Sequence, residues 1–158
     1  MLENGQVTLN LQEDVLSEVL DRACAATERP DAPSGLEIQR DRASETALLK
    51  TDSDRLTQVF INLIANAQKY CDAVSPALNI TAHEVNNRAV VDFVDNGRGV
   101  PADKQNMIFE KFARADDHRA AGGAGLGLAI CREVMKRLGG EISYLPGQGG
   151  AAFRVTLP

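Results

Sequence analysis

The sequence predicts an α/β (α+β) two-layer sandwich, in which a mixed, largely antiparallel sheet is covered on one face by about three helices. Three observations predict this class. Apolar residues recur at helical spacing along one long segment, about 53–71. Two apolar strands flank the turn Asn86-Asn87-Arg88, and a glycine-rich segment runs directly into a last helix. The length of 158 residues and the hydrophobic fraction of 44% suit one globular domain, 1–158.

The first third of the chain should contain three short strands and one helix. Alternating apolar residues predict a half-buried strand over 7–11, and helical spacing follows from Val15 to Ala23. Prolines and a glycine in the segment 28–35 end that helix. Two further short strands are expected at 36–38 and 48–49.

The long helix has Asp52 or Ser53 as its cap and ends near Cys71, before the Ser75-Pro76 break. The elements expected after it are strands at 78–85 and 89–94, a helix at 126–138, and strands at 141–145 and 152–157.

A long connection separates the hairpin from the last helix. Residues 95–125 are rich in glycine and charge, and they contain one short helix at about 103–112. Compact domains rarely tolerate structureless connections above about 12–15 residues, so we expect a mobile lid at about 97–125.

Charge and composition exclude several classes of protein. Seventeen basic and 22 acidic residues give a net charge of −5, which argues against nucleic acid as a partner. The dispersed cysteines, Cys24, Cys71 and Cys131, suggest neither a zinc site nor a disulfide framework. The sequence shows no membrane span and no signal peptide, so we expect a cytoplasmic domain without direct membrane contact.

The long helix carries an apolar arc and a polar arc. The polar arc is formed by Arg55, Gln58, Asn62, Asn66 and Lys69, which we expect to face solvent. Asparagine forms helices poorly, so two asparagines one turn apart suggest a function, although a solvated polar face is the alternative. The apolar arc, predicted as core, is Leu56, Val59, Phe60, Leu63, Ile64 and Ala67.

Two glycine-rich segments complete the pattern. Asp95-Asn96-Gly97-Arg98-Gly99 follows an apolar strand, and an ordinary turn is its alternative reading. Residues 122–127 open the last helix, where backbone amides could cradle phosphate, and a hinge without ligand is the alternative. Neither segment is a Walker loop or a dinucleotide fingerprint.

The order of these motifs, with Phe109 and Phe112 between them, resembles the N, G1, F and G2 boxes of the sensor histidine kinase ATP-binding domain. That domain shares the Bergerat fold with DNA gyrase, heat-shock chaperones and mismatch-repair ATPases. The resemblance covers nearly the whole chain and implies ATP and Mg²⁺ as cofactors. It implies that Phe109 and Phe112 anchor the lid.

The resemblance also implies a role for individual residues. Asn66 matches the magnesium ligand, Lys69 a phosphate contact, and Tyr70 a residue beside the nucleoside. Asp95 matches the carboxylate that accepts a hydrogen bond from the adenine amino group, and Arg114 a contact to the terminal phosphate. Gly97 and Gly99 would act as hinges, and Ala124 stands where a hydroxyl residue is common. The implied nucleotide-binding residues at the two ends of the lid are Gly97, Gly99, Val100, Gly123, Gly125, Leu126, Gly127 and Leu128.

Asn62 bears on the mechanism. Hydrolysing relatives carry a glutamate at the matching position, whereas an amide cannot act as a base, so we expect weak ATP hydrolysis. The catalytic set, Asn62, Asn66, Lys69 and Arg114, would instead serve transfer of the terminal phosphate to a histidine.

The accepting histidine should lie elsewhere. His83 is expected on the polar side of a strand as a plain exposed residue, and His118 in the lid. The phosphoacceptor helical hairpin then belongs to another part of a longer protein or to another chain, and the domain alone is inactive in transfer. A response regulator would act downstream in a two-component system, and the domain could be the cytoplasmic part of a membrane-bound sensor.

Three alternatives to the histidine kinase remain at this point. They are a nucleotide-gated binding module, an anti-sigma-type serine kinase and an ATP-hydrolysing clamp. Asn62 and the short chain disfavour the clamp.

Overall fold

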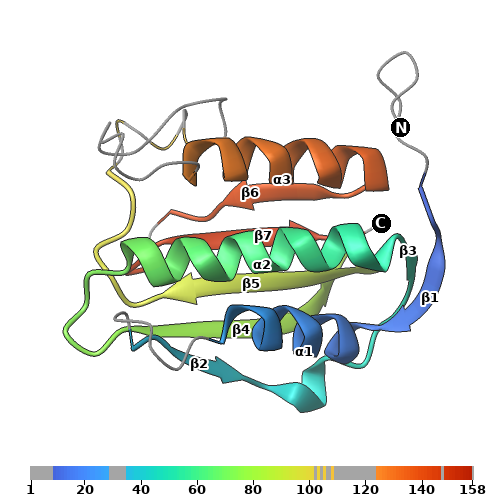
Figure 1. Cartoon of the computed structure of the whole chain (residues 1–158), viewed down its shortest axis with the longest axis horizontal. Coiled ribbons are helices and arrows are strands. Elements are labelled where there is room, and N and C mark those ends of the chain that lie inside the picture. The colour runs from blue at the N-terminus through green and yellow to red at the C-terminus, as the bar shows by residue number, and fades with distance from the viewer. Residues whose placement is uncertain are drawn as a thin grey trace.

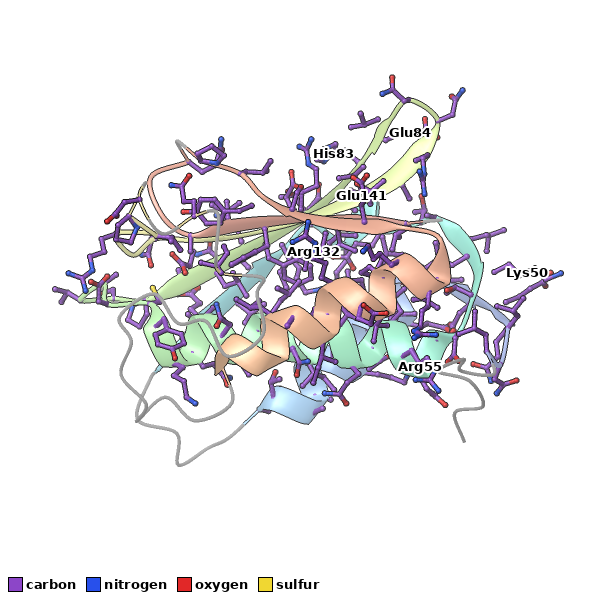
Figure 2. All side chains as sticks on the ribbon, turned by 90° about the horizontal axis from the view of Figure 1, so that it is seen from above. Lys50, Arg55, His83, Glu84, Arg132 and Glu141 are labelled. Atoms are coloured by element: carbon purple, nitrogen blue, oxygen red, sulfur yellow. The ribbon has the colours of Figure 1, made fainter. Side chains whose placement is uncertain are left out.

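The computed structural model describes residues 9–28, 35–101, 103, 105, 108, 124–146 and 148–157. These residues form a five-stranded sheet with three α-helices on one of its faces (Figure 1). Viewed from above, the two layers separate clearly, with the helices on one side of the sheet (Figure 2). The predicted two-layer class with a mixed, largely antiparallel sheet is confirmed.

The strand order in the sheet is β2-β4-β5-β7-β6. Only β2 and β4 run parallel among the described strand pairs of this sheet, and the other neighbours are antiparallel. The strands are β2 (Glu37–Arg40), β4 (Ala77–Val85), β5 (Arg88–Asp95), β6 (Glu141–Tyr144) and β7 (Ala152–Thr156).

The β4–β5 hairpin forms where the sequence predicts it. Its tip is the two-residue turn Asn86-Asn87, and both residues adopt positive φ, 53° and 67°. Asparagine tolerates this left-handed conformation, and such a turn matches the twist of the flanking strands. Arg88, expected in the turn, is instead the first residue of β5.

The helices are α1 (Leu16–Thr27), α2 (Ser53–Tyr70) and α3 (Ala124–Leu138). Asp52 caps α2, because its carboxylate accepts a hydrogen bond from the Arg55 amide at 3.2 Å. The predicted start and end of α2 are therefore confirmed. α3 begins two residues before the predicted 126, so Ala124 and Gly125 belong to its first turn.

The strand expected over 7–11 is wrong in the part that the structure describes. Residues 9–11 are not a strand, and β1 instead covers Gln12–Val15, where Val15 also precedes the first turn of α1. β1 pairs antiparallel with β3 (Leu48–Thr51) in a separate two-stranded sheet. Because β3 is only four residues long, the ladder ends at Gln12 and leaves Leu11 56% exposed.

The core lies between the helices and the sheet. Phe60 of α2 meets Phe93 of β5 with ring centroids 5.3 Å apart, and both side chains are fully buried. The whole apolar arc predicted for α2 is buried in this layer. The burial of these large side chains orients α2 along the sheet and fixes where its last turn lies.

Candidate functional site

Three chain segments carrying predicted site residues end at the same side of the molecule. The last turn of α2, the last residue of β5 and the first turn of α3 all lie toward the left in Figure 1. The residues expected in the rest of the lid fall outside the described part of the chain: Phe109, Phe112, Arg114, His118 and Gly123. The short helix at about 103–112 also falls largely outside it, so the lid stays a prediction.

Asp95 ends β5 as a buried carboxylate, 7% exposed. Its Oδ1 accepts hydrogen bonds from the amides of Gly97, at 2.9 Å, and Ala151, at 3.0 Å. Among the described residues, no donor reaches Oδ2 and no cationic side chain pairs with Asp95. A buried carboxylate normally fills its acceptor positions, so Oδ2 is available to a ligand that donates a hydrogen bond.

The segment after α2 is fixed against the end of β5. The Asn96 side chain donates to the Ser75 carbonyl at 2.9 Å and accepts from the Ala77 amide at 2.9 Å. The Cys71 thiol also donates to the Asn96 Oδ1, at 3.2 Å. Asp72 accepts from the Arg98 amide at 3.1 Å and pairs with its guanidinium. These contacts hold the wall of the site that lies beside Asp95.

The glycines of this segment sit in tight surroundings. Gly99 has a φ of +81°, and a Cβ there would lie 3.1 Å from the backbone of Gly150. A Cβ on Gly97 would lie 2.9 Å from Asp72 Oδ1. The next amide, that of Val100, donates to the Tyr144 hydroxyl at 3.1 Å. Close packing thus explains why glycine is needed at positions 97 and 99. Their role as hinges stays a prediction.

The two asparagines of α2 differ in their contacts. Asn62 accepts a hydrogen bond from Gln58 Nε2 at 3.2 Å and donates to the Cys131 thiol of α3, with 3.5 Å between Nδ2 and Sγ. Asn66 is half-buried, and its amide has no hydrogen-bond partner among the described residues. The prediction that this arc faces solvent is wrong for Asn62, because α3 packs against α2 there.

The buried environment keeps Cys131 a neutral thiol. Burial raises the pKa of Cys131 to about 11, against a smaller opposite effect of the hydrogen bond from Asn62. The thiol also donates toward the Val59 carbonyl, with 3.9 Å between Sγ and O. Asn62 is therefore part of the packing between α2 and α3.

The other predicted residues lie around this end of the molecule. Lys69 is exposed and Tyr70 is 37% exposed, both in the last turn of α2. Leu128 of α3 is 8% exposed and packs in the core. Gly125, Leu126 and Gly127 lie in the first turn of α3, where backbone amides have no partners within the helix. The N-terminal end of a helix favours anions such as phosphate.

The donor set fits a nucleotide with a hard cation. Among the described residues, no group of three or more His, Cys, Asp or Glu side chains could hold a metal by itself. Magnesium takes few protein ligands and keeps phosphate and water oxygens. The Asn66 amide oxygen, which has no partner in the described part of the chain, is a suitable neutral ligand, and Asp95 Oδ2 is a suitable acceptor for an amino group.

One cluster was missed by the sequence analysis and lies on the other face of the sheet. Arg154 of β7 holds Asp92 of β5 through two hydrogen bonds of 2.8 and 3.0 Å. His83 is exposed on β4, as expected, and its Nε2 lies 3.3 Å from an Arg154 nitrogen. Figure 2 shows His83 on the side of the sheet away from the helices. Its ring lies beside the cross-strand pair of Arg154 and Asp92 and not at Asp95.

Comparison with known proteins identifies the class of domain. The model of the histidine kinase-, DNA gyrase B- and HSP90-like ATPase family matches residues 51–158, and the chain belongs to this family. Sensor protein KdpD of Escherichia coli (strain K12) is 36% identical over 158 residues, 99% of this chain. Sensor protein kinase WalK of Staphylococcus haemolyticus (strain JCSC1435) is 39% identical over 124 residues, 75% of this chain.

Solved structures agree with this assignment. Full-length ShkA in complex with AMPPNP superposes with a TM-score of 0.81 at 28% identity, covering 98% of this chain and 32% of that one. Other structures that share the fold are catalytic domains of histidine kinases. The chain thus represents the ATPase-type catalytic domain of sensor histidine kinases.

The relatives are much longer than this chain, which spans 17% of KdpD and 20% of WalK. In the described part of the chain, no helix has the length and apolar character that a bilayer crossing requires.

Proposed function

We propose that this domain binds Mg-ATP and transfers the terminal phosphate to a histidine on a separate dimerisation and phosphoacceptor hairpin. The observation that carries the proposal is the Asp95 carboxylate, which is buried, has one oxygen held by two backbone amides and offers the other oxygen to a donor. The exocyclic amino group of adenine is a donor of the right kind. Binding of AMPPNP by ShkA, which shares the fold, supports the proposal.

The chain's own residues would divide the work as follows. Asn66 would hold the magnesium ion, which when bound neutralises phosphate charge during transfer. Lys69 would contact phosphate, Tyr70 would lie beside the nucleoside, and the first turn of α3 would present its amides to the phosphates. Arg114, outside the described residues, is proposed as a further phosphate contact.

Asn62 favours transfer over hydrolysis. Its amide oxygen already accepts from Gln58 and its amide nitrogen donates to Cys131, and an amide has no basic lone pair to take a proton from water. We therefore propose that Asn62 belongs to the catalytic set because it holds α3 in place and supplies no base that could activate water. This argues against the ATP-hydrolysing clamp.

The proposed partners follow from transfer. They are ATP, the phosphoacceptor hairpin on the same protein or another chain, and a response regulator downstream, in a cytoplasmic setting. His83 does not suit an acceptor, because it lies beside Arg154 on the face of the sheet opposite the helices, and His118 falls outside the described residues. A nucleotide-gated binding module and an anti-sigma-type serine kinase remain the alternatives.

The test is a transfer assay with the chain, magnesium, radiolabelled ATP and a separate histidine-bearing helical hairpin. Label that is acid-labile and base-stable on the hairpin supports the proposal, and a hairpin with its histidine changed to alanine is the matched control. Binding of ATP without label on the hairpin would indicate the binding module. Acid-stable label on a serine substrate would indicate the serine kinase, and rapid release of free phosphate the clamp.

A further inference from the structure

We propose that Gly150, in the loop between β6 and β7, is a positioning residue that aims the Asp95 carboxylate at the amino group of the adenine base. This inference rests on the proposed function, because it assigns a task to Asp95 that only a bound adenine nucleotide would reveal. None of the predicted motifs includes this loop, which reaches the site only through the pairing of β5 with β7.

The backbone of Gly150 lies against Asp95 more closely than any side chain would allow. A Cβ built on Gly150 would lie 2.0 Å from the Asp95 carbonyl oxygen and 2.7 Å from its Oδ1. The first of these is a backbone atom, so a larger residue would displace either the end of β5 or the loop itself. Gly150 is buried, and its φ is not in the left-handed region. Glycine is therefore needed at this position because a side chain would not fit, and not because of the backbone conformation.

This close approach places the neighbouring amide on the carboxylate. The Asp95 amide donates to the Ala151 carbonyl at 2.9 Å, and the Ala151 amide donates back to Asp95 Oδ1 at 3.0 Å. The β5–β7 register ends at Val94 opposite Ala152, so this reciprocal pair continues the ladder by one step. With the Gly97 amide on the same oxygen, Oδ1 has both of its acceptor positions filled.

The filled Oδ1 determines which ligand chemistry Asp95 can recognise. The carboxylate cannot rotate without breaking two hydrogen bonds, so Oδ2 is held as a pure acceptor in one direction. A purine with an amino group at position 6 can donate to it. A purine with hydrogen at position 6 would leave it unpaired, and a purine with a carbonyl there would face it with a second acceptor. Gly150 would thus help set base specificity without touching the base.

The experiment compares Gly150→Ala with the unchanged chain by calorimetry, using ATP and purine riboside triphosphate, which lacks the amino group. We expect the unchanged chain to prefer ATP, and Gly150→Ala to lose roughly ten- to a hundredfold in ATP affinity. Affinity for purine riboside triphosphate should change less than about twofold, since it makes no use of Oδ2. A loss of packing alone would weaken both nucleotides alike.

Two further variants keep the result interpretable. Gln148→Ala changes an exposed residue of the same loop and should bind both nucleotides like the unchanged chain. Ala151→Pro removes the amide that donates to Oδ1 but keeps the carbonyl that accepts from Asp95. If thermal unfolding shows that Gly150→Ala does not fold, Ala151→Pro tests the same hydrogen bond in its place. It should show the same selective loss for ATP.

The outcomes separate this inference from the proposed function. If the unchanged chain prefers ATP and both loop variants keep that preference, the role of Gly150 is wrong while the adenine assignment stands. An equal loss for both nucleotides would also overturn it. If the unchanged chain binds the two nucleotides equally, Asp95 does not read the amino group, and both proposals fail together.

Discussion

Two aspartates of one strand, three residues apart, show how differently a buried carboxylate can be used. Asp92 and Asp95 both lie on β5 and are 8% and 7% exposed. Asp92 is on the outer face of the sheet, where Arg154 compensates its charge through two hydrogen bonds. Asp95 points to the helix side at the end of the strand and, among the described residues, receives backbone amides but no cation.

Asp92 stabilises the sheet through its pair with Arg154, whereas Asp95 has an oxygen available to a ligand. The hydrogen bonds to Asp92 raise the pKa of Arg154, as expected for a pair that satisfies itself within the protein. A buried carboxylate with an unfilled oxygen is costly unless a ligand completes it. The contrast therefore supports the Asp95 assignment independently of any motif.

The asparagines of α2 show the same contrast between an engaged and an available side chain. Asn62 bridges Gln58 and Cys131, whereas the Asn66 amide has no partner among the described residues. One turn of helix thus separates a packing contact from a candidate ligand.

The largest expected effect follows from the available asparagine. Asn66→Ala should leave the fold intact, because its amide makes no described contact that would be lost. A metal contributes several kcal/mol to charge stabilisation, so magnesium-dependent transfer should fall by more than about a hundredfold. The measurement is label on the hairpin as a function of magnesium concentration, with circular dichroism for the fold. An unfolded variant would show instead that Asn66 has a structural role.

The next effect should appear in stability and not in binding. Asp92→Ala leaves the Arg154 guanidinium without its carboxylate, and because the Arg154 side chain is 31% exposed, water compensates part of the loss. We expect about 1–2 kcal/mol less free energy of unfolding in urea and ATP affinity within about twofold. A large loss of ATP affinity in folded Asp92→Ala would break the contrast between the two aspartates.

The smallest effect should come from the engaged asparagine. Asn62→Ala removes two modest hydrogen bonds, one of them to sulfur. We expect the free energy of unfolding to fall by about 1 kcal/mol. Urea denaturation measures this, and Gln58→Ala, which removes one of the two contacts, is the matched control. ATP hydrolysis should stay as weak as before, since neither alanine nor asparagine can act as a base. Faster hydrolysis in Asn62→Ala would contradict the inference that hydrolysis is weak because position 62 lacks a base.

Features set by neighbouring residues could be predicted from the sequence. The Asp52 cap, the buried arc of α2 and the Asn86-Asn87 turn depend on local spacing and local backbone preference, and all three are present. The family and its fold could also be predicted, because each motif is a short continuous stretch of the sequence.

Features set by strand pairing could not be predicted. Arg154 meets Asp92 across a separation of 62 residues, and Ala151 meets Asp95 across 56, only because β5 pairs with β7 in one register. The position of β1 likewise depends on the length of β3, its partner. The register between two strands depends on the whole sheet, and it cannot be read from the alternation of apolar and polar residues within one strand.

The most direct test of the central claim is calorimetry of ATP binding to Asp95→Asn. Asparagine keeps an oxygen for the Gly97 and Ala151 amides but replaces the other carboxylate oxygen by a donor, so the fold should survive while the adenine contact is lost. We predict that ATP affinity falls roughly ten- to a hundredfold, as for a hydrogen bond to a charged group of ~1.5–3 kcal/mol. Unchanged ATP affinity in a folded Asp95→Asn would contradict the claim that this carboxylate reads the nucleotide.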